Sequence, residues 1–424
     1  MTSPEIVAMD HVIVGNGPAG VVAAETLRKN DPWGRITLIG DEPGPAYSRM
    51  AIPYMLAGNI TEPGTYLRKT PGHFERLRIE PLEARVASID LGASAVKLSD
   101  GKALPFDRLL LATGSRPIEP PIPGIGLPGV HPCWTLEDAR AVMAKAKPGA
   151  RVVQMGAGFI GCIILQALAE RGVTLTVVEM GNRMVPRMMT EKAGGLIKQW
   201  CESKGVRVLT STKVESIAPS GNGDGLAVKL STGETLTADL VISATGVRPS
   251  TELAKAAGLT VDVGIRVDSG MRTSDPRVFA AGDVAQAEET YTRSFIVNAV
   301  QPNAADQARV AAINMAGGRA VSNGSFRMNV LDTLGLIASS FGQWQGVPGG
   351  DHVEHVDETG YGYVGLQFEG DRLVGATTLG VTNHVGVLRG LIQSNRPLGR
   401  WKEVLRHDPL ALMETYLATV QAAA

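Results

Sequence analysis

The chain has 424 residues, of which 44% are hydrophobic and 20% are charged. Its 41 Lys and Arg residues balance 42 Asp and Glu residues, so the formal net charge is −1. This balance argues against a nucleic-acid-binding protein and against an acidic disordered tail. The composition is typical of a globular protein of about two to four domains with a large buried core.

The sequence shows no targeting segment. Residues 1–10 contain no basic stretch followed by an apolar run, so we expect no secretory signal. No run of about 18 apolar residues occurs, so we expect no transmembrane helix. Cys133, Cys162 and Cys201 lie far apart and form no CxxC pair. This pattern predicts a cytoplasmic protein with neither a cysteine-ligated iron–sulfur cluster nor a paired redox disulfide within this chain.

Two segments share the pattern of strand, glycine turn, helix and strand. An apolar strand precedes each turn, at 11–14 and 151–155, and another follows, at 36–39 and 173–178. The first turn contains Gly15, Gly17, Pro18, Ala19 and Gly20. The second turn contains Gly156, Gly158, Phe159, Ile160 and Gly161. A single GxGxxG is a weak signal, but two copies in this context predict two dinucleotide-binding βαβ units.

The chemistry of such a turn explains its residues. The first glycine permits the tight bend, the second lets a pyrophosphate approach the backbone, and the third lets helix pack on strand. The positive helix N-terminus then faces the phosphates. A carboxylate after the second strand accepts hydrogen bonds from a ribose. Glu179 in the second unit favours NAD(H) over NADP(H), although Arg183 is near enough to compete, and Asp41 or Glu42 has this position in the first unit.

Further segments resemble the pyridine nucleotide–disulfide oxidoreductases, flavoproteins with two dinucleotide folds. Segments 111–117 and 243–249 resemble their two ATG motifs, and 273–283 resembles their second FAD fingerprint. The resemblance covers nearly the whole chain. It implies that Asp283 bonds the ribityl chain of FAD and that a helix beginning near 298–302 points its positive end at the flavin N1/O2 edge. The further nucleotide-binding residues that it implies are Ala112, Thr113, Gly114, Gly246, Gly282, Gln301 and Pro302.

Segment 46–54 bears on the branch of the superfamily. It is similar to the region where NADH oxidases, NADH peroxidases and coenzyme A-disulfide reductases carry one redox cysteine, and Met50 stands in its place. A thioether cannot form the sulfenate or mixed disulfide of those mechanisms. The segment also resembles the Tyr-x-Arg segment of ferredoxin, rubredoxin and nitrite reductases, which implies that Arg49 contacts FAD.

Two positions depart from the reductase pattern. Tyr54 and Ile163 stand where ferredoxin reductase-like members have Lys and Glu, so the ion pair near flavin N5 is missing. Phe159 and Tyr54 are candidate neighbours of the nicotinamide or the flavin, and Phe159 is equally consistent with helix–sheet packing. We expect no catalytic side chain, because the flavin carries the chemistry. We interpret His352 and His355 as exposed residues of an alternating strand, and expect no metal site.

These observations predict an α/β protein with two Rossmann-like dinucleotide-binding domains, for FAD and NAD, and a C-terminal α+β interface domain. The expected segments are 1–118 (FAD, first), 119–247 (NAD(P)), 248–318 (FAD, second) and 319–424 (C-terminal domain). A hairpin tip is expected at 220–225. In the C-terminal domain, we expect strands at 329–340, 361–368 and 372–378 and helices at 385–394 and 400–417.

The function that this pattern favours is an FAD-dependent NAD(P)H oxidoreductase. It would take hydride from NADH and pass electrons to a ferredoxin- or rubredoxin-like redox protein or to a small molecule. One alternative is a flavin- and NAD-bound sensor or interaction protein resembling apoptosis-inducing factor, and another is an NADH oxidase that uses oxygen. We expect FAD and NAD(H), with NADP(H) less favoured, and leave open a homodimer through the C-terminal domain.

Overall fold

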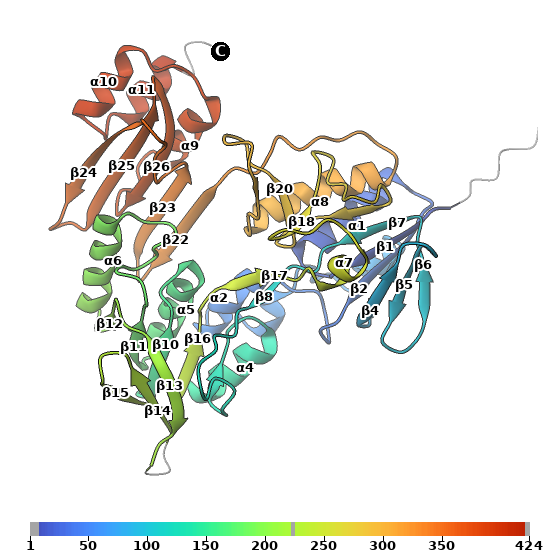
Figure 1. Ribbon diagram of the computed structural model, residues 1–424, viewed down its shortest axis with the longest axis horizontal. Helices are drawn as coiled ribbons and strands as arrows, with labels where there is room; N and C mark the ends of the chain where they lie inside the picture. The colour runs from blue at the N-terminus through green and yellow to red at the C-terminus, as the bar shows by residue number, and fades with distance from the viewer. Residues whose placement is uncertain (1–7, 222–224, 420–424) are drawn as a thin grey trace, which may run out of the picture. The chain divides into compact units, whose positions relative to one another are not determined.

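The computed structural model describes residues 8–221 and 225–419, and its chain divides into two compact units (Figure 1). Unit 1 comprises Met1–Met55, Ile60–Arg116 and Val247–Phe326, and unit 2 comprises Leu56–Asn59, Pro117–Gly246 and Arg327–Ala424. The contacts thus group the C-terminal residues with the second dinucleotide fold, and the division into three domains stays a prediction. Residues 1–7, which bear on the expected lack of a secretory signal, lie outside the described residues.

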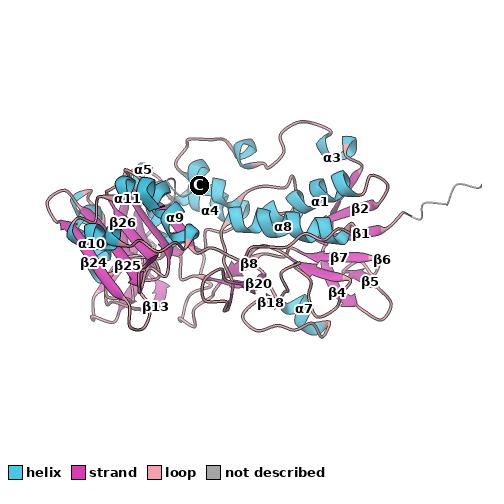
Figure 2. Ribbon diagram, turned by 90° about the horizontal axis from the view of Figure 1, so that it is seen from above, coloured by secondary structure: helices cyan, strands magenta, loops and turns pink. Residues whose placement is uncertain are grey.

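A five-stranded parallel sheet forms the centre of unit 1, in the order β19-β7-β1-β2-β3. Its strands are β1 (Asp10–Val14), β2 (Arg35–Gly40), β3 (Ile79–Glu83), β7 (Arg108–Leu111) and β19 (Val278–Ala280). Helices α1 (Pro18–Asn30) and α8 (Gln301–Met315) lie on one face of this sheet (Figure 2). The central strand β1 is buried from His11 to Val14 and apolar from Val12, as expected for a parallel strand covered on both faces.

Smaller elements complete unit 1. An antiparallel sheet contains β4 (Val86–Asp90), β5 (Ala95–Leu98) and β6 (Ala103–Pro105). A second small sheet contains β18 (Ile265–Arg266), β20 (Ala285–Glu288) and β21 (Phe295–Ile296). The short helices are α2 (Ile52–Leu56), which runs to the unit boundary, α3 (His73–Arg76), α7 (Glu252–Ala256), and the 3₁₀ turns η1 (Arg49–Ala51) and η2 (Glu62–Thr65). Two short paired strands, β8 (Ser115–Pro117) and β17 (Val247–Pro249), lie at the unit boundaries.

Unit 2 repeats the parallel arrangement, in the order β12-β11-β10-β16-β9. Its strands are β9 (Val130–His131), β10 (Arg151–Met155), β11 (Thr174–Val178), β12 (Arg207–Leu209) and β16 (Leu240–Ser243). Its helices are α4 (Leu136–Lys145), α5 (Phe159–Glu170) and α6 (Glu191–Ser203). An antiparallel sheet of β13 (Val214–Pro219), β14 (Leu226–Leu230) and β15 (Thr235–Ala238) packs Val228 and Leu230 against Val153 and Val241. The predicted hairpin tip joins β13 to β14, and its residues 222–224 lie outside the described residues.

The C-terminal residues of unit 2 form a five-stranded antiparallel sheet, in the order β22-β23-β26-β25-β24. Its strands are β22 (Met328–Thr333), β23 (Leu336–Gly342), β24 (Asp351–Asp357), β25 (Gly362–Glu369) and β26 (Arg372–Leu379). The helices are α9 (Val385–Ser394), α10 (Arg400–His407) and α11 (Leu412–Thr419). His352 and His355 lie exposed on edge strand β24, and the described residues contain no cluster of His, Cys, Asp and Glu able to hold a metal ion.

Two expected elements in this region are wrong in detail. The single strand predicted at 329–340 is a hairpin, because Leu334 and Gly335 have positive φ values of 55° and 87° and reverse the chain. The helix predicted at 400–417 is two helices. Pro409 disfavours a helical conformation at the preceding Asp408, whose φ and ψ are −133° and 94°. Within the described residues, no helix has the length and apolar content needed to cross a membrane.

Trp200 of α6 joins the second dinucleotide fold to the C-terminal sheet. Its indole Nε1 donates hydrogen bonds to the carbonyl oxygens of Thr333 (3.1 Å) and Leu334 (3.2 Å) at the tip of the β22–β23 hairpin. The ring of Tyr361 packs edge-on against it, with 5.2 Å between centroids. A further ion pair joins Lys192 of α6 to Glu358. These contacts lie within unit 2 and explain why the C-terminal residues group with this fold.

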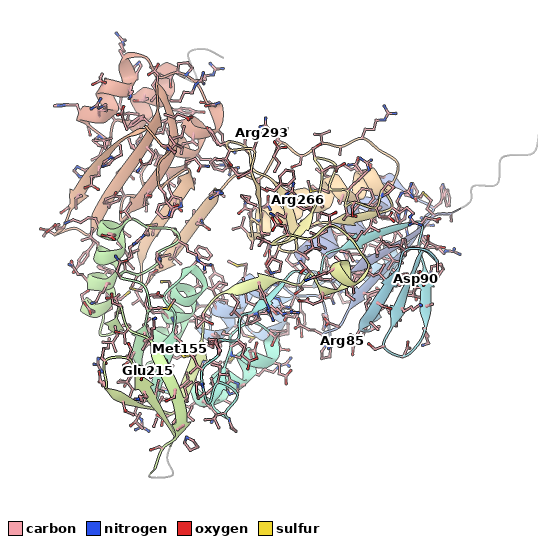
Figure 3. The ribbon with its side chains drawn as sticks, in the orientation of Figure 1. Arg85, Asp90, Met155, Glu215, Arg266 and Arg293 are labelled. Carbon is pink, nitrogen blue, oxygen red and sulfur yellow. The ribbon has the colours of Figure 1, made fainter. Side chains whose placement is uncertain are left out.

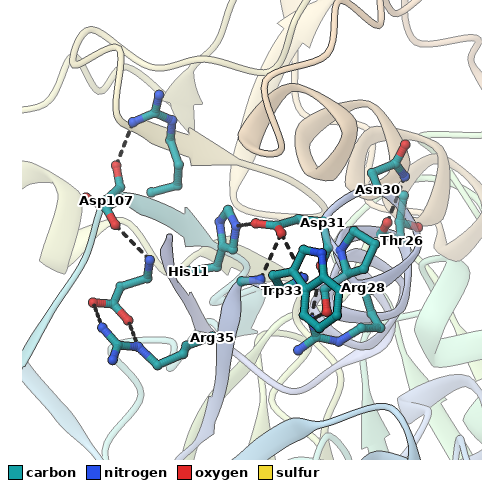
Figure 4. A network of polar contacts seen from close by, with 12 residues as sticks. His11, Thr26, Arg28, Asn30, Asp31, Trp33, Arg35 and Asp107 are labelled. Carbon is teal, nitrogen blue, oxygen red and sulfur yellow. Dashed lines mark hydrogen bonds and ion pairs between the residues drawn. The ribbon is translucent and has the colours of Figure 1, made fainter. Parts of the chain in front are cut away.

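A buried histidine organises the connection between α1 and β2 in unit 1 (Figure 4). His11 is 1% exposed, and its Nε2 lies 2.9 Å from Asp31 Oδ2. The other oxygen of Asp31 accepts hydrogen bonds from the backbone N–H groups of Trp33 (3.1 Å) and Gly34 (2.8 Å). Burial lowers the pKa of His11, and the hydrogen bond to Asp31 opposes this effect only in part. The folded protein therefore favours the neutral imidazole.

We expect this histidine to make stability depend on pH. The folded-state pKa of His11 is below the unfolded value of 6.5. Its contribution to the free energy of unfolding is therefore complete above pH 6.5 and is lost as the pH falls from 6.5 towards the lower folded-state pKa. The free energy of unfolding should therefore decrease between pH 7.5 and 5.5, by at most ~1.4 kcal/mol per pH unit for one proton. Chemical denaturation at several pH values should show a smaller slope for His11→Gln. His352→Gln, on exposed edge strand β24, is the matched control and should keep the wild-type slope; equal slopes for all three proteins would contradict the assignment.

Candidate functional site

The first glycine turn lies between β1 and α1 in unit 1. Gly15 has a φ of +112°, and a Cβ added there would lie 2.1 Å from the carbonyl oxygen of Ala112. A Cβ at Gly20 would lie 1.8 Å from the carbonyl oxygen of Gly15. Around Gly17, by contrast, no atom lies within 4 Å of the added Cβ. The outer two glycines are thus required by packing, whereas the middle one leaves open space beside the backbone.

The second glycine turn, between β10 and α5 in unit 2, repeats this geometry. It follows directly on Met155, the last residue of β10 (Figure 3). Gly156 has a φ of +97°, and an added Cβ would lie 2.4 Å from the carbonyl oxygen of Ala244. A Cβ at Gly161 would lie 2.5 Å from Gly156 O, and Gly158 again faces open space. Both turns therefore have the cradle that a pyrophosphate needs.

The helix that follows each turn has an N-terminus free of acidic side chains. Helix α1 begins at Pro18 with Gly17 as its N-cap, and α5 begins at Phe159 with Gly158 as its N-cap. Neither N-cap has a side chain to bond the first backbone N–H groups, and neither first turn contains Asp or Glu. The positive ends of both helix dipoles thus lie at the open glycine. Phe159 and Ile160 are half-buried in the first turn of α5.

The ATG-like segments begin at the ends of β7 and β16, and their backbone leaves no room for a side chain at the first glycine of each turn. Ala112 N donates to Val14 O and Ala244 N donates to Met155 O, each at 2.8 Å. In unit 1, Thr113 Oγ1 donates to Ser250 O (2.9 Å), and Gly114, with a φ of +67°, accepts from Ser250 N (3.0 Å). In unit 2, Gly246 has a φ of +109° and accepts from the backbone N–H of Ile118 at 2.9 Å.

Glu179 lies beside the second turn, immediately after β11. It is 8% exposed, and its Oε2 accepts a hydrogen bond from Ala157 N while its Oε1 accepts one from Gly181 N, both at 2.7 Å. Arg183 donates to the carbonyl oxygens of Met189 (2.9 Å) and Pro186 (3.3 Å) and is engaged with its own loop. The carboxylate predicted to face a ribose is therefore held by backbone N–H groups of the turn and of Gly181.

Of the two candidate ribose carboxylates in unit 1, Asp41 and Glu42, only Glu42 is half-buried. It accepts a hydrogen bond from Arg49 Nη2 (2.5 Å) and another from the hydroxyl of Tyr47. The guanidinium of Arg49 also lies 5.6 Å from the centroid of the Tyr47 ring. Asp41 is exposed. The structure thus brings together Glu42 and Arg49, two of the residues predicted to contact FAD, and leaves Asp41 in solvent.

The remaining predicted FAD residues meet where β19 leads towards α8. Asp283 accepts a hydrogen bond from Ser115 Oγ at 2.7 Å, and burial raises the pKa of this carboxyl while Ser115 and the charge of Arg49 oppose the shift. Gly282 has a φ of +82°, and a Cβ added there would lie 3.2 Å from Ala19 Cβ and 3.5 Å from Ala304 Cβ. Helix α8 begins at Gln301, within the predicted range, and has no side-chain N-cap. The start of α8 therefore agrees with the predicted range, whereas the role of its positive end towards a flavin stays a prediction.

Four side chains of the segments expected near the flavin lie at the surface. Gln301 and Pro302 are exposed, and Gln301 Oε1 accepts a hydrogen bond from Ser48 Oγ at 2.8 Å. This bond joins the N-terminus of α8 to the segment that contains Arg49. Met50 is 47% exposed and Tyr54 is 58% exposed. Segment 46–54 thus presents two apolar side chains to solvent.

Three further residues near these turns had no role assigned from the motifs. Ser115 holds Asp283, as described above. Gln307 of α8 is 3% exposed, and its Oε1 accepts a hydrogen bond from Gly282 N at 2.9 Å. Gln154 of β10 is fully buried, and its Nε2 donates to Gly156 O. The only sequence signal for Gln154 is an uncharged polar residue within an apolar strand, two positions before the first glycine.

All three cysteines are free and buried. Burial raises the pKa of Cys133 and of Cys201 to about 12, and it also raises the pKa of Cys162. Cys162 Sγ lies 3.6 Å from Ala157 O, inside the second turn. Thiols with raised pKa values carry little thiolate at neutral pH and are poor nucleophiles.

The two turns, each with a carboxylate after the following strand, define a protein with two dinucleotide-binding folds. A family model described as pyridine nucleotide-disulphide oxidoreductase matches residues 9–312, and the chain belongs to this family. It is therefore an oxidoreductase, and membership implies binding of FAD and a nicotinamide dinucleotide.

Individual relatives agree with this assignment. The chain is 30% identical to the epsilon subunit of NADH-dependent phenylglyoxylate dehydrogenase from Aromatoleum evansii, over 95% of this chain and 96% of that protein. It is 33% identical to rubredoxin–NAD(+) reductase from Pseudomonas putida, over 72% of this chain and 80% of that protein. Among solved structures, the covalent putidaredoxin reductase–putidaredoxin complex matches with a TM-score of 0.87 and 29% identity, over 97% of this chain and 98% of that chain.

The open space at Gly158 makes it a clean test of the second turn. Its φ of −74° suits any residue, and nothing lies within 4 Å of an added Cβ, so Gly158→Val should fold. The new side chain would occupy the space that a pyrophosphate needs. We expect the Kd for NADH to rise about tenfold or more, a loss of roughly 1.4 kcal/mol, with FAD retained. Calorimetric titration measures this change.

The control for this variant is Gly195→Val on α6, which also faces open space but lies away from the turn. It should bind NADH as the wild type does. An unchanged Kd in Gly158→Val would mean that the nicotinamide nucleotide binds elsewhere.

Proposed function

We propose that this protein is an FAD-dependent NADH reductase that delivers electrons to a small redox protein without using a redox cysteine. The observation that carries the proposal is the pair of glycine turns with different carboxylates, Glu42 next to Arg49 in unit 1 and Glu179 bonded by amides in unit 2. The first suits a resident FAD and the second an exchangeable NADH.

The residues around the first turn fit FAD. Gly17 leaves room for the pyrophosphate at the α1 N-terminus, and Glu42 can accept hydrogen bonds from the adenosine ribose. Asp283 is a largely buried carboxyl that accepts a hydrogen bond from Ser115, and it suits a ribityl hydroxyl. The positive end of α8 would stabilise negative charge on the N1/O2 edge of the ring. When bound, the flavin accepts two electrons from a nicotinamide and releases them to an acceptor.

The second turn favours NADH as the donor. Glu179 would accept hydrogen bonds from the ribose hydroxyls and would repel a 2′-phosphate. Arg183, the nearby cation that could offset this repulsion, is bound to its own loop carbonyls. The chain's own contribution to the reaction is to bind and orient the two nucleotides, and Phe159, half-buried at the start of α5, is a candidate to contact the nicotinamide.

The acceptor is proposed from the relatives. One relative is a rubredoxin reductase, and one similar solved structure is a complex of putidaredoxin reductase with putidaredoxin. These similarities support a small electron-transfer protein as the partner. A second candidate role is the NADH-linked subunit of a multi-subunit dehydrogenase. It is favoured by one observation: the epsilon-subunit relative matches 95% of this chain, whereas the rubredoxin reductase matches 72%. A cytoplasmic location and a homodimer through residues 319–424 remain proposals from the sequence.

We expect a yellow protein that releases FAD on denaturation and is reduced anaerobically by NADH. NADPH should be at least about tenfold less efficient, because one unfavourable charge contact is worth roughly 1.4 kcal/mol or more. The reduced protein should transfer electrons to a rubredoxin or a ferredoxin faster than to oxygen. Rapid-mixing absorbance with each acceptor in turn measures these rates.

The other outcomes each favour a different function. Fastest reoxidation by oxygen would indicate an NADH oxidase. A reduced protein that resists every acceptor would indicate a sensor or interaction protein. FMN in place of FAD would refute the architecture, and a preference for NADPH would show that Arg183 governs the donor site.

A second prediction concerns the cysteines. If no thiol takes part, reductive titration should consume two electrons per FAD, and no thiolate-to-flavin charge-transfer absorbance should develop. The variant Cys133→Ala/Cys162→Ala/Cys201→Ala should keep NADH-to-ferricyanide activity within about twofold, because the thiols are buried and protonated.

The matched positive control is Met50→Cys, which places a thiol where related oxidases and disulfide reductases carry theirs. Met50 is 47% exposed, so the smaller side chain fits. This variant should develop the charge-transfer absorbance that the wild type lacks. A triple variant that folds, keeps FAD and cannot be reoxidised would disprove the thiol-free path.

A further inference from the structure

Gln154 is a fully buried polar residue in the central strand of the second dinucleotide fold. Its neighbours in register are Val177 on β11 and Ile242 on β16, both fully buried. The equivalent residue of the first fold, two positions before the first glycine of its turn, is Ile13, which is also fully buried. An aliphatic side chain therefore satisfies packing at this position of the fold, and the amide of Gln154 needs another explanation.

The amide joins the two ends of the glycine turn. Gln154 Nε2 donates one hydrogen bond to the carbonyl oxygen of Gly156 and another to that of Gly161, each at 2.9 Å. Two carbonyl acceptors identify this atom as the nitrogen, because an oxygen there would face two oxygens. One side chain thus connects the first glycine, at the end of β10, to the third, inside α5.

The turn that Gln154 holds is more open than the turn of unit 1. A Cβ at Gly161 would lie 2.5 Å from Gly156 O, whereas the equivalent Cβ at Gly20 would lie 1.8 Å from Gly15 O. In unit 1, strand and helix are in tighter contact. In unit 2, the Gln154 amide fills the position between them, 3.2 Å from the Cβ that Gly161 lacks.

These bonds leave the other half of the amide unsatisfied. Gln154 Oε1 is buried and has no hydrogen-bond partner among the residues that the structure describes. A buried acceptor without a partner is unfavourable, and an aliphatic side chain would avoid it. Oε1 of Gln154 thus lowers the stability of the protein, while Nε2 fixes two carbonyl groups of the turn.

The Gly156 bond also acts on Glu179. The carbonyl of Gly156 and the N–H of Ala157 belong to one planar trans peptide and point in opposite directions. Gln154 holds the carbonyl end, and Glu179 Oε2 accepts from the N–H end at 2.7 Å. The orientation of the carboxylate expected to face the ribose is therefore coupled through one peptide plane to Gln154.

We propose that Gln154 is a positioning residue for the nicotinamide nucleotide: it sets the separation of strand and helix at the second turn and, through the Gly156–Ala157 peptide, the orientation of Glu179. The proposal rests on the proposed function, in which this turn binds NADH. It assigns to Gln154 both part of the affinity for NADH and part of the discrimination against NADPH, although the side chain contacts neither nucleotide.

The test compares Gln154→Leu with Leu240→Ala in the holoenzyme. Leucine has a similar size and removes both donors. Leu240 lies on β16 in register with Val152, on the same side of the sheet as Gln154, and is fully buried. Its truncation removes packing without touching the turn. The measurements are Kd for NADH and for ADP-ribose, the ratio of NADH to NADPH efficiency, the limiting rate of flavin reduction, FAD content and Tm.

We expect Gln154→Leu to raise both Kd values about tenfold, because the turn and Glu179 would no longer be held in the orientation that binds the nucleotide. The NADH preference should fall several-fold, while FAD content and the limiting rate of flavin reduction stay within about twofold. Leu240→Ala should lower Tm and leave Kd and the preference unchanged. If Gln154→Leu does not fold, Gln154→Met offers a flexible side chain of similar length for the same comparison.

A Gln154 variant that lowers Tm as Leu240→Ala does, with Kd and donor preference unchanged, would show that the residue only fills the core. Failure of the proposed function has a different signature, because Gly158→Val would then bind NADH normally. If Gly158→Val loses NADH binding but Gln154→Leu and Gln154→Met keep wild-type affinity and preference, the inference about Gln154 alone is wrong.

Discussion

The close approach of a backbone carbonyl to the first glycine of each turn is the constraint on which both nucleotide sites depend. Ala112 O and Ala244 O come within 2.1 Å and 2.4 Å of the Cβ positions that Gly15 and Gly156 lack. Ala112 and Ala244 directly follow the strands β7 and β16, about 90 residues after each turn. The glycine motif and the ATG-like motif, distant in sequence, are therefore two sides of one contact. A side chain at either glycine would push the strands apart and displace the helix N-terminus.

The two turns share this contact and differ in what surrounds it. In unit 1 Glu42, predicted to face a ribose, accepts hydrogen bonds from the side chains of Arg49 and Tyr47, which follow it in the chain. In unit 2 the carboxylate Glu179 is bonded to backbone N–H groups of the turn and of Gly181. Side-chain contacts suit a nucleotide that is enclosed and retained. A carboxylate held by backbone N–H groups suits one that enters and leaves.

Patterns along the chain predicted what depends on local backbone geometry. Both turns, the strands beside them and the start of α5 follow from glycine spacing and apolar runs, whereas the start of α8 was expected only from the resemblance to the family. Helix α9 was also predictable, whereas the break between α10 and α11 required the effect of Pro409 on Asp408 to be given more weight. Ser115, Gln154 and Gln307 could not be assigned roles, because their hydrogen bonds depend on which buried atom a side chain reaches. A polar residue in an apolar strand indicates that its side chain has a hydrogen-bond partner, but the sequence does not identify that partner.

The bond between Trp200 and the β22–β23 hairpin bears on how this enzyme could be divided or recombined. The indole N–H donates to two carbonyl oxygens at the hairpin tip, and Tyr361 packs on the same ring. Cutting the chain after residue 326 would leave this N–H and the apolar surface around it without their partners. Residues 327–419 therefore belong to the folding unit of the second dinucleotide fold. A chimaera that exchanged them for the corresponding part of a relative would need a matching hairpin for Trp200, whatever acceptor that relative serves.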